Sequence, residues 1–312
     1  MSFELPEVAV LLAAYNGMSW IEEQLASILA QTNVHVSIYI SVDPSTDGTE
    51  GWCAEYAATH PNVTLLPPAG PFKGAARNFF RLIRDVDFSE YDFVSFSDQD
   101  DIWYPDKLER AIAKLRSDDV DGYSSNVVAF WPNGRRMRVD KAQPQVQWDY
   151  LFEAAGPGCT YVLKPALAAG FKKLILDEWK RVQEVALHDW FCYAYARSHG
   201  FKWFIDPVPG MDYRQHAGNQ VGVNAGFRTA VARAKKALDG WWFEQVRLVA
   251  SLTRIGVPNM EADESESDLS ILRIISNVRQ YRRRPRDRVA LLLICACQIA
   301  TSLNTEPTSA RD

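Results

Sequence analysis

Three carboxylates, Asp98, Asp100 and Asp101, directly follow an apolar, aromatic run at residues 91–97. Such a run is typical of a buried parallel strand, and open α/β sheets bind their ligands at the carboxyl ends of strands. Three anions this close repel one another, and burying them is costly unless a cation compensates. Oxygen ligands favour magnesium, manganese or calcium over zinc. The cluster predicts a metal site; the alternative is an acidic turn that caps a helix beginning near residues 105–108.

Two cations, Lys73 and Arg77, lie in a glycine-containing segment that is expected to open a helix. The start of a helix is unfavourable for positive charge because of the helix dipole. The placement is explained if both side chains face an anion such as a diphosphate, with the helix N–H groups assisting. The alternative is a pair of solvated residues on an ordinary surface helix.

Two single residues further along the chain could take part in chemistry. Asp189 opens an aromatic helix, where it could cap the helix or act as a general base beside a platform for a sugar ring. His216 lies in a polar loop and is a candidate metal ligand, although a lone histidine is often only hydrogen-bonded. Cys159 has no obvious base nearby and is expected to be a small packed residue.

These residues need a sheet to position them. Strand-like runs near residues 8–15, 34–40, 63–66 and 91–97 alternate with helical patterns, which predicts right-handed crossovers and a mostly parallel sheet. Residues 123–130 are expected to form one further strand. The sequence contains neither G-x-G-x-x-G nor the P-loop pattern, which argues against a dinucleotide-dependent enzyme and a P-loop ATPase.

Composition sets the limits of the interpretation. The chain has 312 residues, of which 47% are hydrophobic, so it can hold one large domain with an appendix. A net charge of -5 argues against general nucleic-acid binding. The five cysteines form no framework, and the acidic N-terminus lacks a signal-peptide pattern, so we expect a cytoplasmic protein.

The C-terminal third has a different character. Residues 225–255 and 268–303 are helical in pattern, and Arg282–Arg288 form a basic cluster before an apolar run at 289–300. That run is too short to span a bilayer. Docking at an anionic membrane surface would suit it, and packing on its own domain or on a partner chain is the equal alternative.

The motifs together resemble those of the family 2 glycosyltransferases, particularly the bacterial rhamnosyltransferase-like branch of surface polysaccharide assembly. The resemblance covers residues 8–222 and rests on five segments in order: Ala14-Tyr15-Asn16-Gly17, Asp43-Pro44-Ser45-Thr46-Asp47-Gly48-Thr49, Ser97-Asp98-Gln99-Asp100-Asp101, His188-Asp189-Trp190 and Tyr213-Arg214-Gln215-His216. It implies an α/β fold of the GT-A type, with a Rossmann-like, mostly parallel sheet flanked by helices and a C-terminal helical extension. The implied domains are residues 1–222, with a nucleotide-sugar half to about 118 and an acceptor half from 119, and residues 223–312.

The resemblance also implies roles for individual residues. Those implied to bind the nucleotide sugar are Ala14, Tyr15, Asn16, Asp43, Lys73, Arg77, Asn78, Asp98 and Gln99. Asp100 and His216 are implied to hold Mg²⁺ or Mn²⁺, Asp189 to be the catalytic base, and His188 and Trp190 to contact the acceptor. The implied reaction is an inverting transfer to a hydroxyl of a glycan or lipid-linked glycan, with dTDP-L-rhamnose as the first expected donor and UDP-hexoses behind it.

Two other functions remain open from the sequence. One is a metal-dependent sugar-nucleotide hydrolase or nucleotidyltransferase, which would act without an acceptor. The other is a non-catalytic subunit of a polysaccharide assembly complex. Contact with the inner face of the cytoplasmic membrane and a homo-oligomer are further expectations that the sequence leaves undecided.

Overall fold

The computed structural model describes residues 4–216, 240–253 and 271–304. The chain divides into two compact units, which are described separately: residues 1–142 with 154–223, and residues 143–153 with 224–312. The expected loop at 217–222 and the expected helical residues 225–239 lie outside the described residues, as does the acidic stretch at 261–268.

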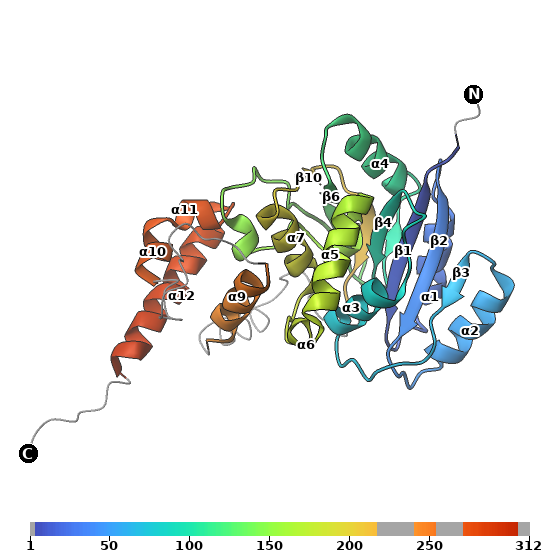
Figure 1. Ribbon diagram of the computed structural model, residues 1–312, viewed down its shortest axis with the longest axis horizontal. Coiled ribbons are helices and arrows are strands. Elements are labelled where there is room, and N and C mark those ends of the chain that lie inside the picture. Colours follow the sequence, from blue (N-terminus) through green and yellow to red (C-terminus); the bar gives the residue numbers. More distant parts are fainter. Residues whose placement is uncertain (1–3, 217–239, 254–270, 305–312) are drawn as a thin grey trace, which may run out of the picture. The chain divides into compact units, whose positions relative to one another are not determined.

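The first unit is built on a seven-stranded sheet in the order β10-β6-β9-β4-β1-β2-β3 (Figure 1). All neighbouring strands run parallel except β9, which is antiparallel to both β4 and β6. The predicted mostly parallel sheet is therefore confirmed. The strands are β1 (Glu7–Ala14), β2 (His35–Val42), β3 (Val63–Leu65), β4 (Phe93–Ser97), β6 (Gly122–Ser125), β9 (Val162–Leu163) and β10 (Trp203–Asp206).

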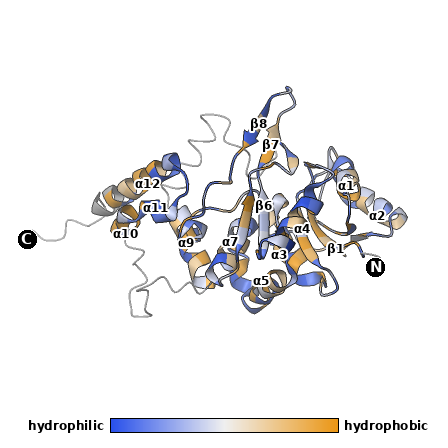
Figure 2. Cartoon of the chain, turned by 90° about the horizontal axis from the view of Figure 1, so that it is seen from above, coloured by the Kyte–Doolittle hydropathy of each residue, from blue (hydrophilic) through white to orange (hydrophobic). Residues whose placement is uncertain are grey.

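Strand β1 lies at the centre of the core because every residue after Glu7 is apolar and buried. Its side chains alternate between the two faces of the sheet. Val8, Val10 and Leu12 belong to one cluster with side chains of helices α1 and α4, and helix α3 lies against β1 as well (Figure 2). A strand covered by helices on both faces must be apolar along its whole length, as this sequence is.

Helices pack against both faces of the sheet, and α3, α5 and α7 contact one another. A short helix, α6, was not expected from the sequence. The helices of this unit are α1 (Ile21–Leu29), α2 (Thr49–Thr59), α3 (Ala75–Asp85), α4 (Lys107–Ser117), α5 (Pro165–Asp177), α6 (Trp179–Val182) and α7 (His188–Ser198), with a 3-10 turn η2 (Gly158–Thr160).

A second, four-stranded sheet has the order β5-β11-β7-β8. Its strands are β5 (Ile102–Trp103), β7 (Val127–Phe130), β8 (Arg136–Val139) and β11 (Met211–Arg214). Because β11 pairs with β5, the residues after β11 come close to the acidic cluster that precedes β5.

The expected single strand at 123–130 is wrong: the chain passes from β6 in the main sheet to β7 in the second sheet at Asn126. The Asn126 side chain is fully buried and donates to the Pro207 carbonyl at 2.9 Å and to Asp140 at 3.0 Å. Its amide oxygen accepts from the Lys141 N–H at 2.6 Å. These bonds satisfy the buried side-chain amide of Asn126. Apolar periodicity in the sequence does not reveal them.

The acidic cluster does not cap the following helix, so the alternative reading of that turn is wrong. Helix α4 begins at Lys107, and its N-cap residue, Asp106, makes no side-chain capping bond. Asp101 lies before β5 and accepts from the backbone N–H of Arg214 at 3.0 Å.

In the second unit, the expected helix at 268–303 is interrupted. Its described elements are η1 (Asp149–Leu151), α9 (Trp241–Leu252), α10 (Ile271–Ser276), α11 (Val278–Tyr281) and α12 (Pro285–Asn304). Arg283, between α11 and α12, is buried and forms ion pairs with Glu153 at 3.3 Å and Asp149 at 3.6 Å. No helix among the described residues has the length and hydropathy to cross a membrane.

Candidate active site

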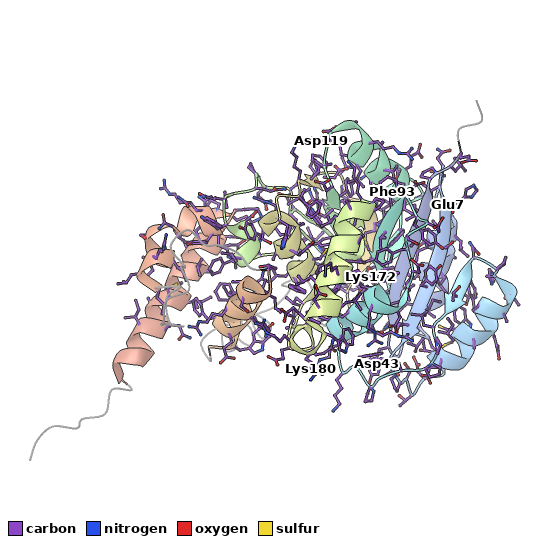
Figure 3. All side chains as sticks on the ribbon, in the orientation of Figure 1. Glu7, Asp43, Phe93, Asp119, Lys172 and Lys180 are labelled. Atoms are coloured by element: carbon purple, nitrogen blue, oxygen red, sulfur yellow. The ribbon has the colours of Figure 1, made fainter. Side chains whose placement is uncertain are left out.

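Three parallel strands end side by side at one edge of the main sheet. β1 and β2 end in register, at Ala14 and Val42, and β4, which pairs with the other side of β1, ends at Ser97. The polar loops that follow these strands therefore emerge together. Figure 3 labels Asp43 at this edge and Glu7 at the opposite one. The predicted convergence of the strand ends is confirmed.

The Gln99 side chain joins the loop after β4 to the loop after β1. Its amide oxygen accepts from the Tyr15 N–H at 2.6 Å, and its amide nitrogen donates to the Tyr15 carbonyl at 2.7 Å. A Cβ on Gly17 would collide with the same amide, which explains the glycine there. Tyr15 itself is 56% exposed. Gln99 thus holds the two loops together, and contact of either residue with a nucleotide sugar stays a prediction.

The loop after β2 is tied down by hydrogen bonds to its carboxylates. Asp43 accepts from the N–H groups of Phe72 at 2.7 Å and Lys73 at 3.0 Å, one on each oxygen. Asp47 accepts from the Met18 and Thr49 N–H groups at 3.0 and 3.1 Å. Although burial acts to raise the pKa of Asp47, these hydrogen bonds lower it overall.

The same turn is fixed to the first loop by Asn16, which has a positive φ of 48°. Its side-chain oxygen accepts from the Thr46 N–H at 2.8 Å, and its own N–H donates to the Ser45 hydroxyl at 3.0 Å. Asparagine tolerates this left-handed conformation better than most residues. Asn16 therefore joins the loop after β1 to the loop after β2, and its contact with a nucleotide sugar stays a prediction.

The three predicted donor-binding residues between positions 73 and 78 lie in the first turn of α3 or just before it. Asn78 is buried and donates to the Ser41 carbonyl at 2.9 Å and the Ala14 carbonyl at 3.4 Å, so it links the ends of β1 and β2. Lys73 and Arg77 are exposed, and Arg77 Nε donates to the Gln183 carbonyl at 2.7 Å. Asn78 therefore has a structural role, whereas Lys73 and Arg77 are surface cations whose contact with a donor stays a prediction.

His216 and Asp100, the two predicted metal ligands, lie next to each other. His216 Nε2 and Asp100 Oδ2 are 2.7 Å apart in a hydrogen bond. The imidazole stacks on the Trp20 ring, with centroids 3.9 Å apart. Arg214 Nε donates to the Asp100 carbonyl at 2.8 Å and so fixes the backbone of both segments. Trp20 was missed by the sequence interpretation, because no spacing rule relates it to a histidine so far along the chain.

The carboxylates of the cluster act strongly on one another. Burial, followed by the charges of Asp100 and Asp189, raises the pKa of Asp98 to about 7. Burial and the charges of Asp100 and Asp98 raise the pKa of Asp101 well above its ordinary value. Ionising all of these carboxylates together is unfavourable, and a bound cation would relieve their repulsion. The carboxylate and imidazole at Asp100 and His216 are suitable ligands for a divalent ion.

Asp189 opens helix α7 within electrostatic reach of this cluster, since its charge contributes to the raised pKa of Asp98. Burial raises the pKa of Asp189 itself to about 6, against the lowering effect of the Trp190 N–H, which donates to it at 2.7 Å, and of Lys141. A Cβ on Gly158 would come within 3.0 Å of Asp189 Cβ, so the glycine allows η2 to approach the carboxylate. Lys141 was not singled out from the sequence.

The flanking residues His188 and Trp190 are buried, at 7% and 4% exposure. His188 stacks on Phe79, with ring centroids 3.8 Å apart, and meets Phe96 edge-on. Burial lowers the pKa of His188 to about 3, so its ring is neutral. Both side chains support α7 from within the core, and the acceptor contact assigned to them stays a prediction.

Comparison with known families decides what this arrangement belongs to. The model of the family described as "Glycosyl transferase family 2" matches residues 9–174, more than half of the chain. The chain belongs to glycosyl transferase family 2. It is a glycosyltransferase of this family, and the matched range contains all three strand ends and the acidic cluster.

Relatives within family 2 match over different lengths. A "dTDP-rhamnosyl transferase RfbG" of Shigella flexneri is 43% identical over 92% of this chain and 100% of its own. A "Putative glycosyltransferase EpsH" of Bacillus subtilis (strain 168) is 30% identical over 45% of this chain and 39% of its own. Among solved structures, S. aureus TarS residues 1–349 in complex with UDP-GlcNAc superposes with a TM-score of 0.53 at 15% identity, covering 94% of this chain and 88% of that one. This likeness confirms the predicted GT-A type of fold.

Proposed function

We propose that this family 2 glycosyltransferase transfers L-rhamnose from dTDP-L-rhamnose to a hydroxyl of a growing bacterial surface glycan such as O-antigen or capsule. The observation that carries the choice of donor is the 43% identity, along 92% of the chain, with the Shigella dTDP-rhamnosyl transferase. The nearness of the acidic cluster to Asp189 supports the reaction type, because a leaving-group site and a base must lie on either side of one anomeric carbon.

A divalent cation, Mg²⁺ or Mn²⁺, is part of this proposal. Asp100 and His216 would hold it, since their ligand atoms already lie 2.7 Å apart and His216 is oriented by Trp20. When bound, the ion would supply positive charge to the departing diphosphate. Lys73, just before the N-cap of α3, and Arg77, in the first turn of that helix, would add positive charge beside the diphosphate.

Asp189 is the proposed general base. With a pKa of about 6 it is mostly ionised at neutral pH, yet basic enough to accept the proton of an acceptor hydroxyl. The hydroxyl would attack the anomeric carbon on the face opposite the diphosphate, so the product would have inverted configuration. This route needs no second carboxylate as a nucleophile.

The test separates donor binding from transfer. In a thermal-shift assay with Mn²⁺, dTDP-rhamnose should raise the melting temperature, and UDP-N-acetylglucosamine and GDP-mannose should not. Asp189→Asn should keep that shift while losing transfer to a lipid-linked glycan acceptor by about 10²- to 10⁴-fold. Asp177→Asn, a change at an exposed carboxylate paired with Lys173 on α5, is the matched control and should leave both properties intact.

Two outcomes would contradict the proposal. Full transfer by Asp189→Asn would remove Asp189 from the role of base. Release of rhamnose at the same rate with and without acceptor would favour a hydrolase.

We also propose that α12 contacts an anionic membrane surface. The predicted basic cluster is only partly available, because Arg283 is ion-paired internally and Arg282 donates to the Phe152 carbonyl at 2.7 Å. The exposed face of α12 nevertheless carries Val289 and Leu293, at 58% and 63% exposure. Residues 271–304 contain seven arginines and one acidic residue, so this region would repel a second copy and attract anionic lipid.

Vesicle co-sedimentation tests this contact. The protein should sediment with phosphatidylglycerol vesicles and not with phosphatidylcholine vesicles, and Leu293→Glu should abolish the difference. A dimer in solution that Leu293→Glu dissociates, without vesicle binding, would instead identify the face as a homo-oligomer interface.

A further inference from the structure

One loop of the acceptor half belongs to the second unit. The chain leaves the first unit after Ala142 and returns to it at Ala154, and residues 143–153 group with the C-terminal helices. Both ends of this loop continue into segments of the first unit that adjoin Asp189. A short stretch of chain therefore connects the C-terminal helices to the surroundings of the proposed base.

The two ends of the loop are fixed within the first unit. Before the loop, the Lys141 N–H donates to the Asn126 amide oxygen at 2.6 Å. After it, the Ala155 N–H donates to the Tyr161 hydroxyl at 3.1 Å. A Cβ on Gly156 would lie 3.9 Å from Lys141 Cβ, so the two ends lie side by side. The segment is therefore a closed loop with fixed ends.

These ends lie where an acceptor hydroxyl would meet its base. A Cβ on Gly158 would lie 2.5 Å from His188 Nε2 and 3.0 Å from Asp189 Cβ, so the Gly158 backbone packs directly against the start of α7. Burial raises the pKa of Asp189, and the Lys141 charge and the Gly158 N–H act against it from the two ends of the loop. Because a base must come within hydrogen-bond distance of the proton it accepts, the acceptor would bind beside both ends.

The middle of the loop is held by a buried arginine. Arg283 Nε lies 3.3 Å from Glu153 Oε1 and 3.6 Å from Asp149 Oδ2, and the Arg283 N–H donates to Glu153 at 2.8 Å. The side chains of Arg283 and Asp149 are fully buried, and that of Glu153 is 9% exposed. Although burial acts to raise the pKa of Glu153, the charges of Arg283 and Arg282 lower it overall. Both carboxylates are thus compensated by the C-terminal unit, and losing the arginine would leave them buried and unpaired.

Neighbouring contacts fix the same part of the loop. The Trp148 N–H donates to the Gln280 carbonyl at 2.8 Å, and the Arg282 guanidinium donates to the Phe152 carbonyl at 2.7 Å. The Phe152 ring meets Tyr281 edge-on, with centroids 4.9 Å apart. The end of α11 and the turn after it therefore contact the loop at several positions.

Helix α12 fixes that turn in place. Arg288 donates from Nε to the Arg282 carbonyl at 2.8 Å and from its terminal nitrogen to the Arg283 carbonyl at 3.0 Å. These three members of the basic cluster thus make contacts within the protein. Their placement is explained if part of the cluster serves to hold the loop.

We propose that Arg283 is a positioning residue, which holds the loop at residues 143–153 so that the C-terminal helices control acceptor binding beside Asp189. A loop with fixed ends and a free middle would adopt the binding conformation for only part of the time, and the apparent affinity for the acceptor would fall by that fraction. Donor binding is assigned to other loops and should not change. The proposal rests on the proposed function only in taking Asp189 as the base.

Steady-state kinetics separate positioning from stability. Arg283→Met should raise KM for the lipid-linked glycan acceptor about 10-fold, because the free loop must be ordered when the acceptor binds. At saturating acceptor, kcat should stay within about twofold of wild type, and the thermal shift with dTDP-rhamnose should be unchanged. Arg283→Lys, which keeps the charge but not the planar guanidinium, should have an intermediate KM. Arg286→Met, at a 74% exposed arginine of α12 that lies 3.4 Å from Asp287, is the matched control and should leave KM unchanged.

Hydrogen–deuterium exchange gives a second readout that needs no substrate. In Arg283→Met, amide exchange should be faster in residues 143–153 and unchanged in β1 and β4, because only the loop loses its partners. Phe152→Leu is a milder change that removes the ring packed on Tyr281. It should act in the same direction on exchange and on KM, and it takes the place of Arg283→Met if that variant does not fold.

An unchanged acceptor KM in a folded variant with faster loop exchange would overturn the proposal. So would a loss of kcat without a change in KM, which is the result expected of a merely destabilised protein. If the wild type transfers nothing from dTDP-rhamnose, the proposed function fails instead, and exchange in residues 143–153 still tests whether Arg283 holds the loop.

Discussion

Two acidic loops leave the same edge of the sheet, and they differ in what their carboxylates contact. In the turn after β2, Asp43 and Asp47 accept hydrogen bonds from backbone N–H groups. In the cluster after β4, Asp98 and Asp101 face other carboxylates, and the pKa of each is raised by burial and by that repulsion. The first loop has its anions compensated by the fold itself.

The contacts of these carboxylates distinguish the two loops better than their residue type does. A carboxylate that accepts several N–H groups is stabilised in its charged form. A carboxylate held among other anions stores electrostatic energy that an added cation can release. The backbone hydrogen bonds of the β2 turn fix its position, and contact of Asp43 with a nucleotide sugar stays a prediction. The β4 cluster with His216 is the part of the edge suited to bind a cation.

The largest expected effect is that of Asp100→Asn. Loss of the charge beside His216 should lower kcat/KM for transfer about 10²- to 10³-fold, because the proposed cation would lose its carboxylate ligand. The melting temperature should change little, because removing the charge of Asp100 also removes its repulsion of Asp98 and Asp101. Kinetics over a Mn²⁺ series check this: transfer that excess Mn²⁺ does not improve and EDTA does not abolish would count against a metal at Asp100.

The next effect is a pH dependence from Asp189. Its pKa is raised to about 6, and a base works only when deprotonated, so kcat/KM should be constant above about pH 7 and fall about tenfold per unit below pH 6. The rate profile between pH 5 and 8 measures it. Asp98, with a pKa of about 7, is the competing origin, so an acid limb that disappears in Asp98→Asn would assign the limb to Asp98 instead.

The sequence predicted the buried strands and the convergence of their ends because apolar runs and the geometry of parallel sheets determine both. It did not predict the corner at Asn126, since buried hydrogen bonds rather than apolar periodicity produce that break. The expected continuous helix at 268–303 failed for a similar reason. Arg283 reads as a solvated basic residue, and only its tertiary partners Asp149 and Glu153 make it part of a core.

The site shows the same limit. The order of the motifs identified Asp100, His216 and Asp189 as candidates. The sequence does not indicate that the side-chain amides of Asn78 and Gln99 donate hydrogen bonds to backbone carbonyls. Nor does it indicate that Lys107 is buried over the Trp103 ring, because a lysine at a helix start is normally solvated. Side-chain contacts between distant segments decide these roles.

A smaller effect is expected at Trp20, which orients the His216 ring from outside the cluster. Trp20→Leu removes the stacked ring, whose centroid lies 3.9 Å from that of the imidazole, and should raise the Mn²⁺ concentration for half-maximal transfer about 10-fold with little change in kcat. Trp52→Leu, in the aromatic stack of α2, is the control for losing an aromatic residue. An unchanged Mn²⁺ requirement in Trp20→Leu would mean that Asp100 and Arg214 suffice to hold the histidine segment.

The smallest effect on transfer is expected from Asp47→Asn in the β2 turn, although it changes a carboxylate at the same edge. The variant should lose about 1 kcal/mol of unfolding free energy, a low figure because the side chain is exposed and screened by water. Since the folded-state pKa of Asp47 is lowered, this stabilisation is present above the ordinary aspartate pKa and is lost as the pH falls through the lowered one. Urea unfolding at pH 7 and pH 3 should therefore show a difference between variant and wild type at pH 7 that shrinks at pH 3. Transfer at 25 °C should stay within about twofold of wild type; a loss as large as that of Asp100→Asn would place the turn in the chemistry and remove the distinction between the two loops.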